Sequence, residues 1–177
     1  GDYGDFTAQV DHTVGQVLKT LDELGMAENT LVIMTSDNGS TEPTGKMVKA
    51  FDHRPNFHFR GRKSDVWEGG HRVPFFVRWP GQVKAGATSK ETETPLREHT
   101  IHHSINGAFA LRQGPWKFID APGSGGWSSN GKAAPGPKAP PVQLYNLDRD
   151  VGEKQNLWEE ASEKVEALKA LLAGAKQ

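Results

Sequence analysis

One continuous apolar run, Thr30-Leu31-Val32-Ile33-Met34-Thr35, constrains the fold of this chain more than any other feature. Apolar and polar residues do not alternate in it, so it predicts a strand covered on both faces, as in a parallel sheet with helices above and below. A helix is predicted immediately before it, over residues 5–24, because apolar residues recur there at helical spacing and Gly25 follows the last of them. Helix, short turn and buried strand make up one half of an α/β unit.

The rest of the chain predicts a different architecture. A second apolar strand is expected over 73–79, followed by a surface loop over 84–98. Further on, the sequence predicts a hairpin with strands over 108–112 and 116–119, a half-buried strand over 142–147 and a terminal helix over 159–172. Residues 120–142 are rich in Gly and Pro and predict neither helix nor strand. The fold class is therefore α/β, followed by a small antiparallel sheet with a C-terminal helix.

Composition excludes several classes of function. The 177 residues include 21 Lys and Arg against 22 Asp and Glu, a formal charge of −1, which argues against a nucleic-acid binder that relies on phosphate neutralisation. No window approaches the ~18 apolar residues of a membrane span, and no leader sequence is visible, so no membrane partner is expected. Cysteine is absent, so thiolate metal sites and cysteine nucleophiles are excluded.

Asp37-Asn38-Gly39, at the carboxyl end of the first predicted strand, is the most informative triplet. Ligands of open α/β sheets bind outside such strand ends. A carboxylate beside an amide carbonyl offers hard oxygen donors suited to Ca²⁺ or Mg²⁺. The alternative is that Asp-Asn-Gly is only turn chemistry.

The long segment between the two apolar strands concentrates charge and glycine. Arg60-Gly61-Arg62-Lys63 holds three cations, and Glu68-Gly69-Gly70-His71-Arg72 follows a few residues later. Paired glycines permit close backbone approach, and clustered Arg and Lys suit a tetrahedral oxyanion such as sulfate or phosphate. The alternative is a solvated basic loop.

Three more residues are candidates. His102 and His103 precede the predicted hairpin, where either could donate a proton or be a packed polar side chain. Trp127 ends the run Gly123-Ser124-Gly125-Gly126-Trp127, an aromatic residue inside a flexible loop that follows no phosphate-binding pattern.

Together these motifs resemble type I sulfatases of the alkaline phosphatase superfamily. Residues 32–39, 60–63 and 67–74 resemble the second half of that catalytic domain, and residues 109–117 and 144–157 resemble the C-terminal hairpin and closing strand of bacterial arylsulfatases. The resemblance covers nearly the whole chain. It implies a C-terminal sulfatase portion with an alkaline-phosphatase-like fold: residues 1–104 from the α/β catalytic domain, internally shortened near 88–100, and residues 105–177 as a smaller subdomain.

The resemblance also implies an activity and a site. The expected activity is hydrolysis of a small-molecule or carbohydrate sulfate ester. Asp37 and Asn38 match two ligands of the family's Ca²⁺ (or Mg²⁺), and Lys63 matches the catalytic lysine that contacts the sulfate. His102 and His103 are expected in the substrate pocket without an assigned role. Relatives are commonly exported, so a periplasmic or secreted location is the corresponding expectation.

The sequence departs from the family pattern in its nucleophile. Sulfatases use a formylglycine made from the first residue of a Cys/Ser-x-Pro-x-Arg motif, and this chain has no such motif. We therefore expect the isolated chain to be inactive and the N-terminal half of the catalytic domain to be its missing partner. Two alternatives stay open: a phosphatase or phosphodiesterase of the same superfamily, because fold does not fix chemistry, and a non-catalytic anion-binding module.

Overall fold

A computed structural model describes residues 2–41, 49–88, 97–129 and 139–175 of the chain. It separates into two compact units: residues 1–35 with 74–91 form the first, and residues 36–73 with 92–177 form the second. None of the described helices has the length and apolar composition needed to cross a bilayer.

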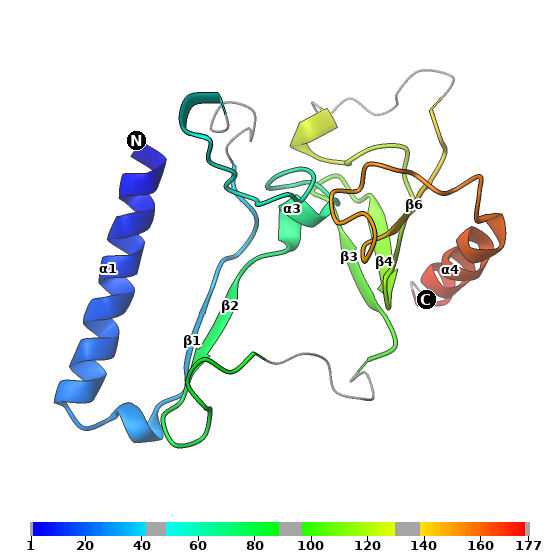
Figure 1. Cartoon of the computed structure of the whole chain (residues 1–177). Helices are drawn as coiled ribbons and strands as arrows, with labels where there is room; N and C mark the ends of the chain where they lie inside the picture. Colours follow the sequence, from blue (N-terminus) through cyan, green and yellow to red (C-terminus); the bar gives the residue numbers. More distant parts are fainter. Residues whose placement is uncertain (1, 42–48, 89–96, 130–138, 176–177) are drawn as a thin grey trace. The chain divides into compact units, whose positions relative to one another are not determined.

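The first unit contains one long helix and a two-stranded ribbon (Figure 1). Helix α1 covers Asp2–Glu23, a 3₁₀ turn η1 covers Ala27–Asn29, and the strands are β1 (Val32–Thr35) and β2 (Phe75–Arg78). The predicted helix and both predicted strands are confirmed. The helical spacing of the apolar residues in α1, together with Gly25 after its last turn, was sufficient to locate the helix.

The pairing of these strands differs from the prediction. β1 and β2 run antiparallel, with Val32 opposite Arg78 and Thr35 opposite Phe75. Ile33 is 51% exposed and Phe76 62%, so neither strand is covered on both faces within this unit. The expectation of a parallel, doubly covered strand was wrong for the described unit because an apolar run encodes how much surface must be buried, and carries no information on strand direction.

Helix α1 packs loosely on the ribbon. A cavity of about 340 Å³ lies between them, lined by side chains that include Val14, Leu18, Met34 and Phe76. Cores are normally packed to the density of organic crystals, so a partly open cavity of this size means that α1 and the ribbon do not form a closely packed core.

The second unit is built on a four-stranded antiparallel sheet in the order β3-β4-β5-β6. Its elements are α3 (Glu68–His71), β3 (Thr100–His103), β4 (Phe109–Gln113), β5 (Trp116–Ile119), η2 (Trp127–Ser129), β6 (Gln143–Asn146) and α4 (Ser162–Ala175). The hairpin, the later strand and the terminal helix are confirmed, whereas β3 was not predicted. Of the two predicted loops, residues 89–96 and 130–138 lie outside the described residues.

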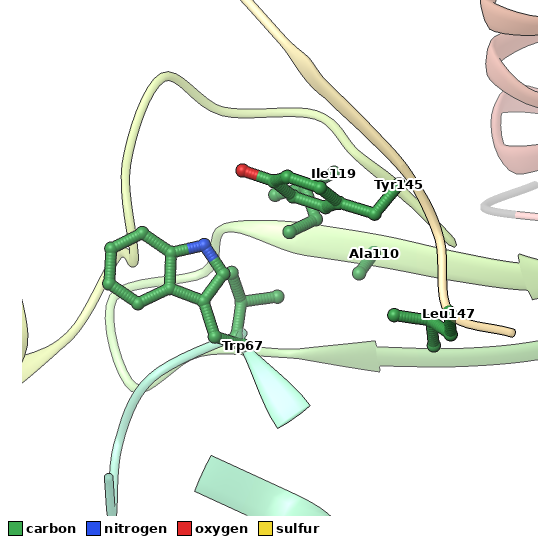
Figure 2. Close-up of a cluster of buried hydrophobic side chains, with 6 residues drawn as sticks. Trp67, Ala110, Ile119, Tyr145 and Leu147 are labelled. Carbon is green, nitrogen blue, oxygen red and sulfur yellow. The ribbon is translucent and has the colours of Figure 1, made fainter. Parts of the chain in front are cut away.

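Both faces of this sheet are covered. On one face Leu111, Phe118 and Leu144 pack against Val165, Leu168 and Leu172 of α4. On the other face Val66 and Trp67 pack against Ala110, Ile119, Tyr145 and Leu147 (Figure 2). The second unit therefore has a core of its own, and the segment that leads into α3 is part of it.

A fully buried cation fastens three segments of this unit together. Lys117 of β5 has no exposed surface, and its Nζ lies 3.0 Å from a carboxylate oxygen of Glu68 in α3 and 3.0 Å from one of Glu153, in the turn after β6. Glu153 also accepts a 2.7 Å hydrogen bond from the Glu68 backbone N–H. Burial alone would raise the pKa of Glu68, but Lys117 and the neighbouring cations hold it below its usual value. Burial raises the pKa of Glu153, and Lys117 only partly offsets that shift.

Replacing Lys117 by Met should lower the free energy of unfolding by about 3–5 kcal/mol, because two buried carboxyl groups would lose their shared cation. Urea denaturation followed by tryptophan fluorescence measures this difference. Lys169→Met on the exposed side of α4 is the matched control and should change the stability by less than about 0.5 kcal/mol. Equal stabilities for the two variants would contradict the role given to Lys117.

Candidate anion and metal site

The turn after β1 presents a carboxylate and an amide side by side. The Asn38 backbone N–H donates to Asp37 Oδ1 at 3.0 Å, and the Ser36 hydroxyl donates to the Asn38 carbonyl at 2.9 Å. Asn38 Nδ2 donates to the Gly39 carbonyl at 3.0 Å, so the side-chain oxygen Oδ1 is the end that can serve as a ligand. Asp37 is exposed and Asn38 is half-buried. The hydrogen bonds that form this turn therefore do not prevent the side-chain oxygens of Asp37 and Asn38 from binding a cation.

Backbone hydrogen bonds tie this turn to the loop that carries Lys63. The Lys63 N–H donates to the Ser40 carbonyl at 3.0 Å. Asn56 bridges the same two segments, because its Oδ1 accepts from the Ser40 N–H at 2.7 Å and its Nδ2 donates to the Gly61 carbonyl at 3.1 Å. The structure therefore brings the segment of Asp37 and Asn38 beside the segment of Lys63. Asn56 was missed, since a single asparagine in a polar loop gives no signal of its own.

Glycines allow the backbones of these segments to touch. The Gly39 N–H donates to the Gly70 carbonyl at 3.0 Å, and a Cβ added at Gly39 would lie 1.7 Å from the Gly69 carbonyl oxygen. A Cβ at Gly69 would in turn lie 2.5 Å from the Gly61 carbonyl oxygen. No side chain fits at either position, so the paired glycines serve close backbone approach, as their spacing indicated.

The three cations of residues 60–63 have different surroundings. Arg60 belongs to the core: it lies over the Trp67 ring at 3.6 Å and donates to the Tyr145 hydroxyl and the Glu153 carbonyl. Arg62 donates to the Trp127 carbonyl at 3.1 Å. Lys63 is half-buried, and its backbone is fixed by Ser40. The three predicted cations therefore do not act as one cluster: Arg60 packs in the core, whereas Arg62 and Lys63 lie nearer the surface.

His102 is placed against the charge network. Its ring lies edge-on to His71 with a centroid separation of 3.8 Å, and both Nε2 atoms approach the Val66 carbonyl. Burial, followed by the Lys117 ammonium, lowers the pKa of His71 to about 4. Burial, with His71 and Lys117, lowers the pKa of His102 to about 3, so both rings are neutral near pH 7. His103 is exposed and pairs with the Ser104 carbonyl at 2.7 Å.

The donor set fits part of a hard-cation site. Asp37 and Asn38 supply oxygen ligands, and Ca²⁺ takes 6–8 of them. Across the described residues no group of three His, Asp or Glu side chains is arranged to hold a metal ion. A cation bound at Asp37 and Asn38 would therefore need further ligands from elsewhere.

Comparison with known proteins decides the family. A family model described as Sulfatase matches residues 1–109. The chain belongs to the sulfatase family. A solved structure from work on glycosaminoglycan metabolism by Bacteroides thetaiotaomicron superposes with a TM-score of 0.72 at 26% identity, over 95% of this chain and 43% of that one. A Pseudoalteromonas sulfatase superposes with a TM-score of 0.70 at 22% identity, over 97% and 41%, which shows the fold alone. The alkaline-phosphatase-like fold class is thus confirmed.

Sequence relatives are longer than this chain. An N-acetylgalactosamine-6-O-sulfatase from Bacteroides thetaiotaomicron is 33% identical over 99% of the chain but only 42% of its own length. A steryl-sulfatase from Rattus norvegicus is 48% identical over 59% of the chain and 18% of its own length. The chain thus spans less than half of these sulfatases. The alternative of a phosphatase gains no support from them.

Gly39→Ala should separate the two loops and lower the free energy of unfolding by about 2 kcal/mol or more, because its methyl group would overlap the Gly69 carbonyl. Thermal denaturation and amide hydrogen exchange at Ser40 and Lys63 measure the effect. Gly174→Ala in α4, where nothing lies within 4 Å, is the control and should be neutral or stabilising. Unchanged exchange in Gly39→Ala would contradict the proposed loop contact.

Acidification should destabilise the chain through its buried histidines. The unfolded chain binds protons at these rings below about pH 6.5, whereas the folded chain does so only near pH 4 and pH 3. The unfolded state therefore binds more protons over that window, and stability falls as the pH falls, by about 2 kcal/mol per histidine between pH 7 and pH 5. Glu153 acts in the opposite sense, because its raised pKa makes the folded state bind a proton first.

The test isolates the histidine contribution by a difference. Urea denaturation at pH 7 and pH 5 is compared for the wild type and His102→Gln, which retains a polar group near the Val66 carbonyl. The variant should lose clearly less stability on acidification than the wild type. Identical losses would show that His102 does not carry the effect.

Proposed function

We propose that this chain is the C-terminal portion of a sulfuric ester hydrolase and supplies half of its active site. Asp37 and Asn38 would hold a Ca²⁺ or Mg²⁺ ion, and Lys63 would bind the sulfate group. The observation that carries the proposal is the set of hydrogen bonds that joins residues 37–40 to residues 56–63. It brings the segment of the hard oxygen donors to the segment of the lysine, within one unit of the fold.

The chemistry of this half-site suits an anionic transition state. A bound divalent cation polarises sulfate oxygens when it is present. The Lys63 ammonium would stabilise charge on the oxygen that leaves, and its fixed backbone limits the reorganisation this requires. The backbone contacts at Gly39 and Gly69 keep the two loops at a defined separation. His102 and His103, both at the end of β3, remain proposed pocket residues; their surroundings support a packed role for His102 and an exposed one for His103.

The nucleophile would come from a complementary N-terminal portion of the catalytic domain. This chain contains neither Cys nor a Ser-x-Pro-x-Arg motif from which formylglycine forms. The relatives' greater length supports such a partner. The first unit supports it further, because Leu31, Ile33 and Phe76 expose large apolar surfaces that would otherwise face water.

The domain boundary near residue 104 also remains a proposal. The family model ends at residue 109, close to the boundary between the proposed domains 1–104 and 105–177. Because 218 positions are aligned with the Bacteroides relative and the chain has 177 residues, at least 41 of those positions lie opposite gaps in this chain. This supports an internal shortening, which we place near residues 88–100.

Calorimetry with the 177-residue chain tests the half-site. Sulfate should bind in the presence of Ca²⁺, and Lys63→Ala should weaken sulfate binding about tenfold or more because a charged hydrogen-bond donor is lost. Asp37→Asn should weaken Ca²⁺ binding, since it removes a charged ligand. Hydrolysis of p-nitrophenyl sulfate should be undetectable in every variant.

Lys169→Ala is the control. It removes the same charge as Lys63→Ala, but from an exposed lysine in α4. Sulfate binding that is equal in Lys63→Ala and Lys169→Ala would rule out the assigned anion site. Turnover of p-nitrophenyl sulfate by the pure chain would rule out the need for an external nucleophile.

A further inference from the structure

The glycine-rich segment before Trp127 is pinned in place along its length. Ser124 is fully buried and its carbonyl accepts from the Val66 N–H at 2.9 Å. A Cβ at Gly125 would lie 2.3 Å from the Ser104 hydroxyl oxygen, and one at Gly126 would lie 2.3 Å from the Ser64 carbonyl oxygen. The flexibility expected from the composition is therefore not what the structure shows: the glycines are there for close packing.

The far end of the segment is held by a buried carboxylate. Asp65 is 3% exposed, and its two oxygens accept from the Ser128 N–H at 3.0 Å, the Ser128 hydroxyl and the Arg62 N–H at 2.9 Å. One side chain thus fixes both Ser128 and the backbone just before Lys63. Trp127, between two anchored neighbours, has a defined position relative to the loop of Lys63.

Trp127 is nevertheless exposed. It is 40% exposed, whereas Trp67 is 8% exposed and the tryptophans at 79, 116 and 158 are half-buried. An exposed indole on an anchored turn loses little conformational entropy when it binds a ligand, which favours a recognition role over a packing one. The fold itself gives no reason for an aromatic residue here, because its side chain is absent from both core clusters.

Arg62 adds a cation beside this indole. Its guanidinium carbon lies 6.0 Å from the centre of the Trp127 ring, and its Nη2 donates to the Trp127 carbonyl. The guanidinium has five N–H donors, so further donors remain for a ligand hydroxyl or oxyanion. Lys63 is the next residue in the sequence after Arg62. The Trp127 indole therefore contacts a residue whose direct neighbour carries the proposed sulfate-binding ammonium.

We propose that Trp127 and Arg62 form a subsite for the sugar ring of a sulfated pyranoside whose sulfate is bound at Lys63. This inference rests on the proposed function. The apolar face of a pyranose ring would lie on the indole, and Arg62 would donate to a ring hydroxyl or acidic substituent. A steroid skeleton suits the site less well, because among the described residues Trp127 is flanked in sequence by Gly126 and Ser128 and contacted by Arg62, and none of these three offers an apolar wall.

The experiment compares three probes on the full 177-residue chain with Ca²⁺: galactose 6-sulfate, methyl galactoside and inorganic sulfate. Calorimetry gives the affinities, and the indole N–H signals of an ¹⁵N-labelled sample show which tryptophan is contacted. Trp127→Phe identifies the Trp127 signal by its loss. The Trp67 signal, whose Nε1 donates to Gln143, reports that each variant is folded.

Galactose 6-sulfate should bind more tightly than inorganic sulfate and shift the Trp127 signal while the Trp67 signal stays in place. Trp127→Ala should weaken galactose 6-sulfate about fivefold and leave inorganic sulfate unchanged, and Trp127→Phe should retain most of the affinity. Arg62→Lys should weaken the sulfated sugar more than inorganic sulfate, because the planar fork is lost.

Each contrary result identifies what fails. If inorganic sulfate binds and depends on Lys63, but Trp127→Ala affects neither ligand, the subsite is wrong and the proposed function stands. Tighter binding of a steroid sulfate than of galactose 6-sulfate would likewise overturn the subsite alone. If no sulfate binds and methyl galactoside at high concentration leaves the Trp127 signal unmoved, both proposals are overturned.

Discussion

The contact between Lys117 and two buried carboxylates is the constraint on which the second unit depends. Moving an ammonium and a carboxylate out of water costs several kcal/mol per ion, and only close pairing with further hydrogen bonds offsets that cost. Here the pairing joins a strand, the short helix α3 and the turn after β6. The Glu68 N–H also donates to the Glu153 carboxylate, and the next N–H, of Gly69, donates to the Arg60 carbonyl at 2.7 Å. The loop that carries Lys63 is therefore anchored to the buried group of Lys117, Glu68 and Glu153.

The site itself is assembled mostly by main-chain contacts. The turn of Asp37 and Asn38 meets the Lys63 loop through carbonyl and amide groups, and Gly39 and Gly69 remove the side chains that would prevent this. Asn56 and Asp65 are both buried, and they accept hydrogen bonds from the Ser40 and Arg62 N–H groups, respectively. Because backbone groups carry these contacts, the Asp37 carboxylate and the Lys63 ammonium are not required to hold the two loops together.

Sequence patterns over a few residues predicted most of the helices and strands. Contacts between residues far apart in the sequence could not be predicted in this way. The helical stripe of α1 and the turn between β4 and β5 act within a few residues, so periodicity located them. Lys117 was invisible because Trp-Lys-Phe-Ile is typical of a strand with one solvent-facing lysine, whereas its partners lie 49 residues away at Glu68 and far along the chain at Glu153. Asp37-Asn38 and Lys63 could be proposed as site residues because their residue types, and their match to the sulfatase pattern, indicate that chemistry. Asn56 had no such signal.

The two units differ in how completely they bury their apolar side chains. The proposed half-site lies in the unit that buries them more completely. The first unit leaves Ile33 and Phe76 exposed and has a cavity between its helix and its strands, so its packing is open to a further polypeptide. The second unit covers both faces of its sheet, and the hydrogen bonds that join residues 36–40 to residues 56–63 lie within it. Burial of those apolar side chains, at roughly 25 cal/mol per Å², stabilises the second unit. The loops that we propose to bind the anion thus belong to the unit whose own core covers both faces of its sheet.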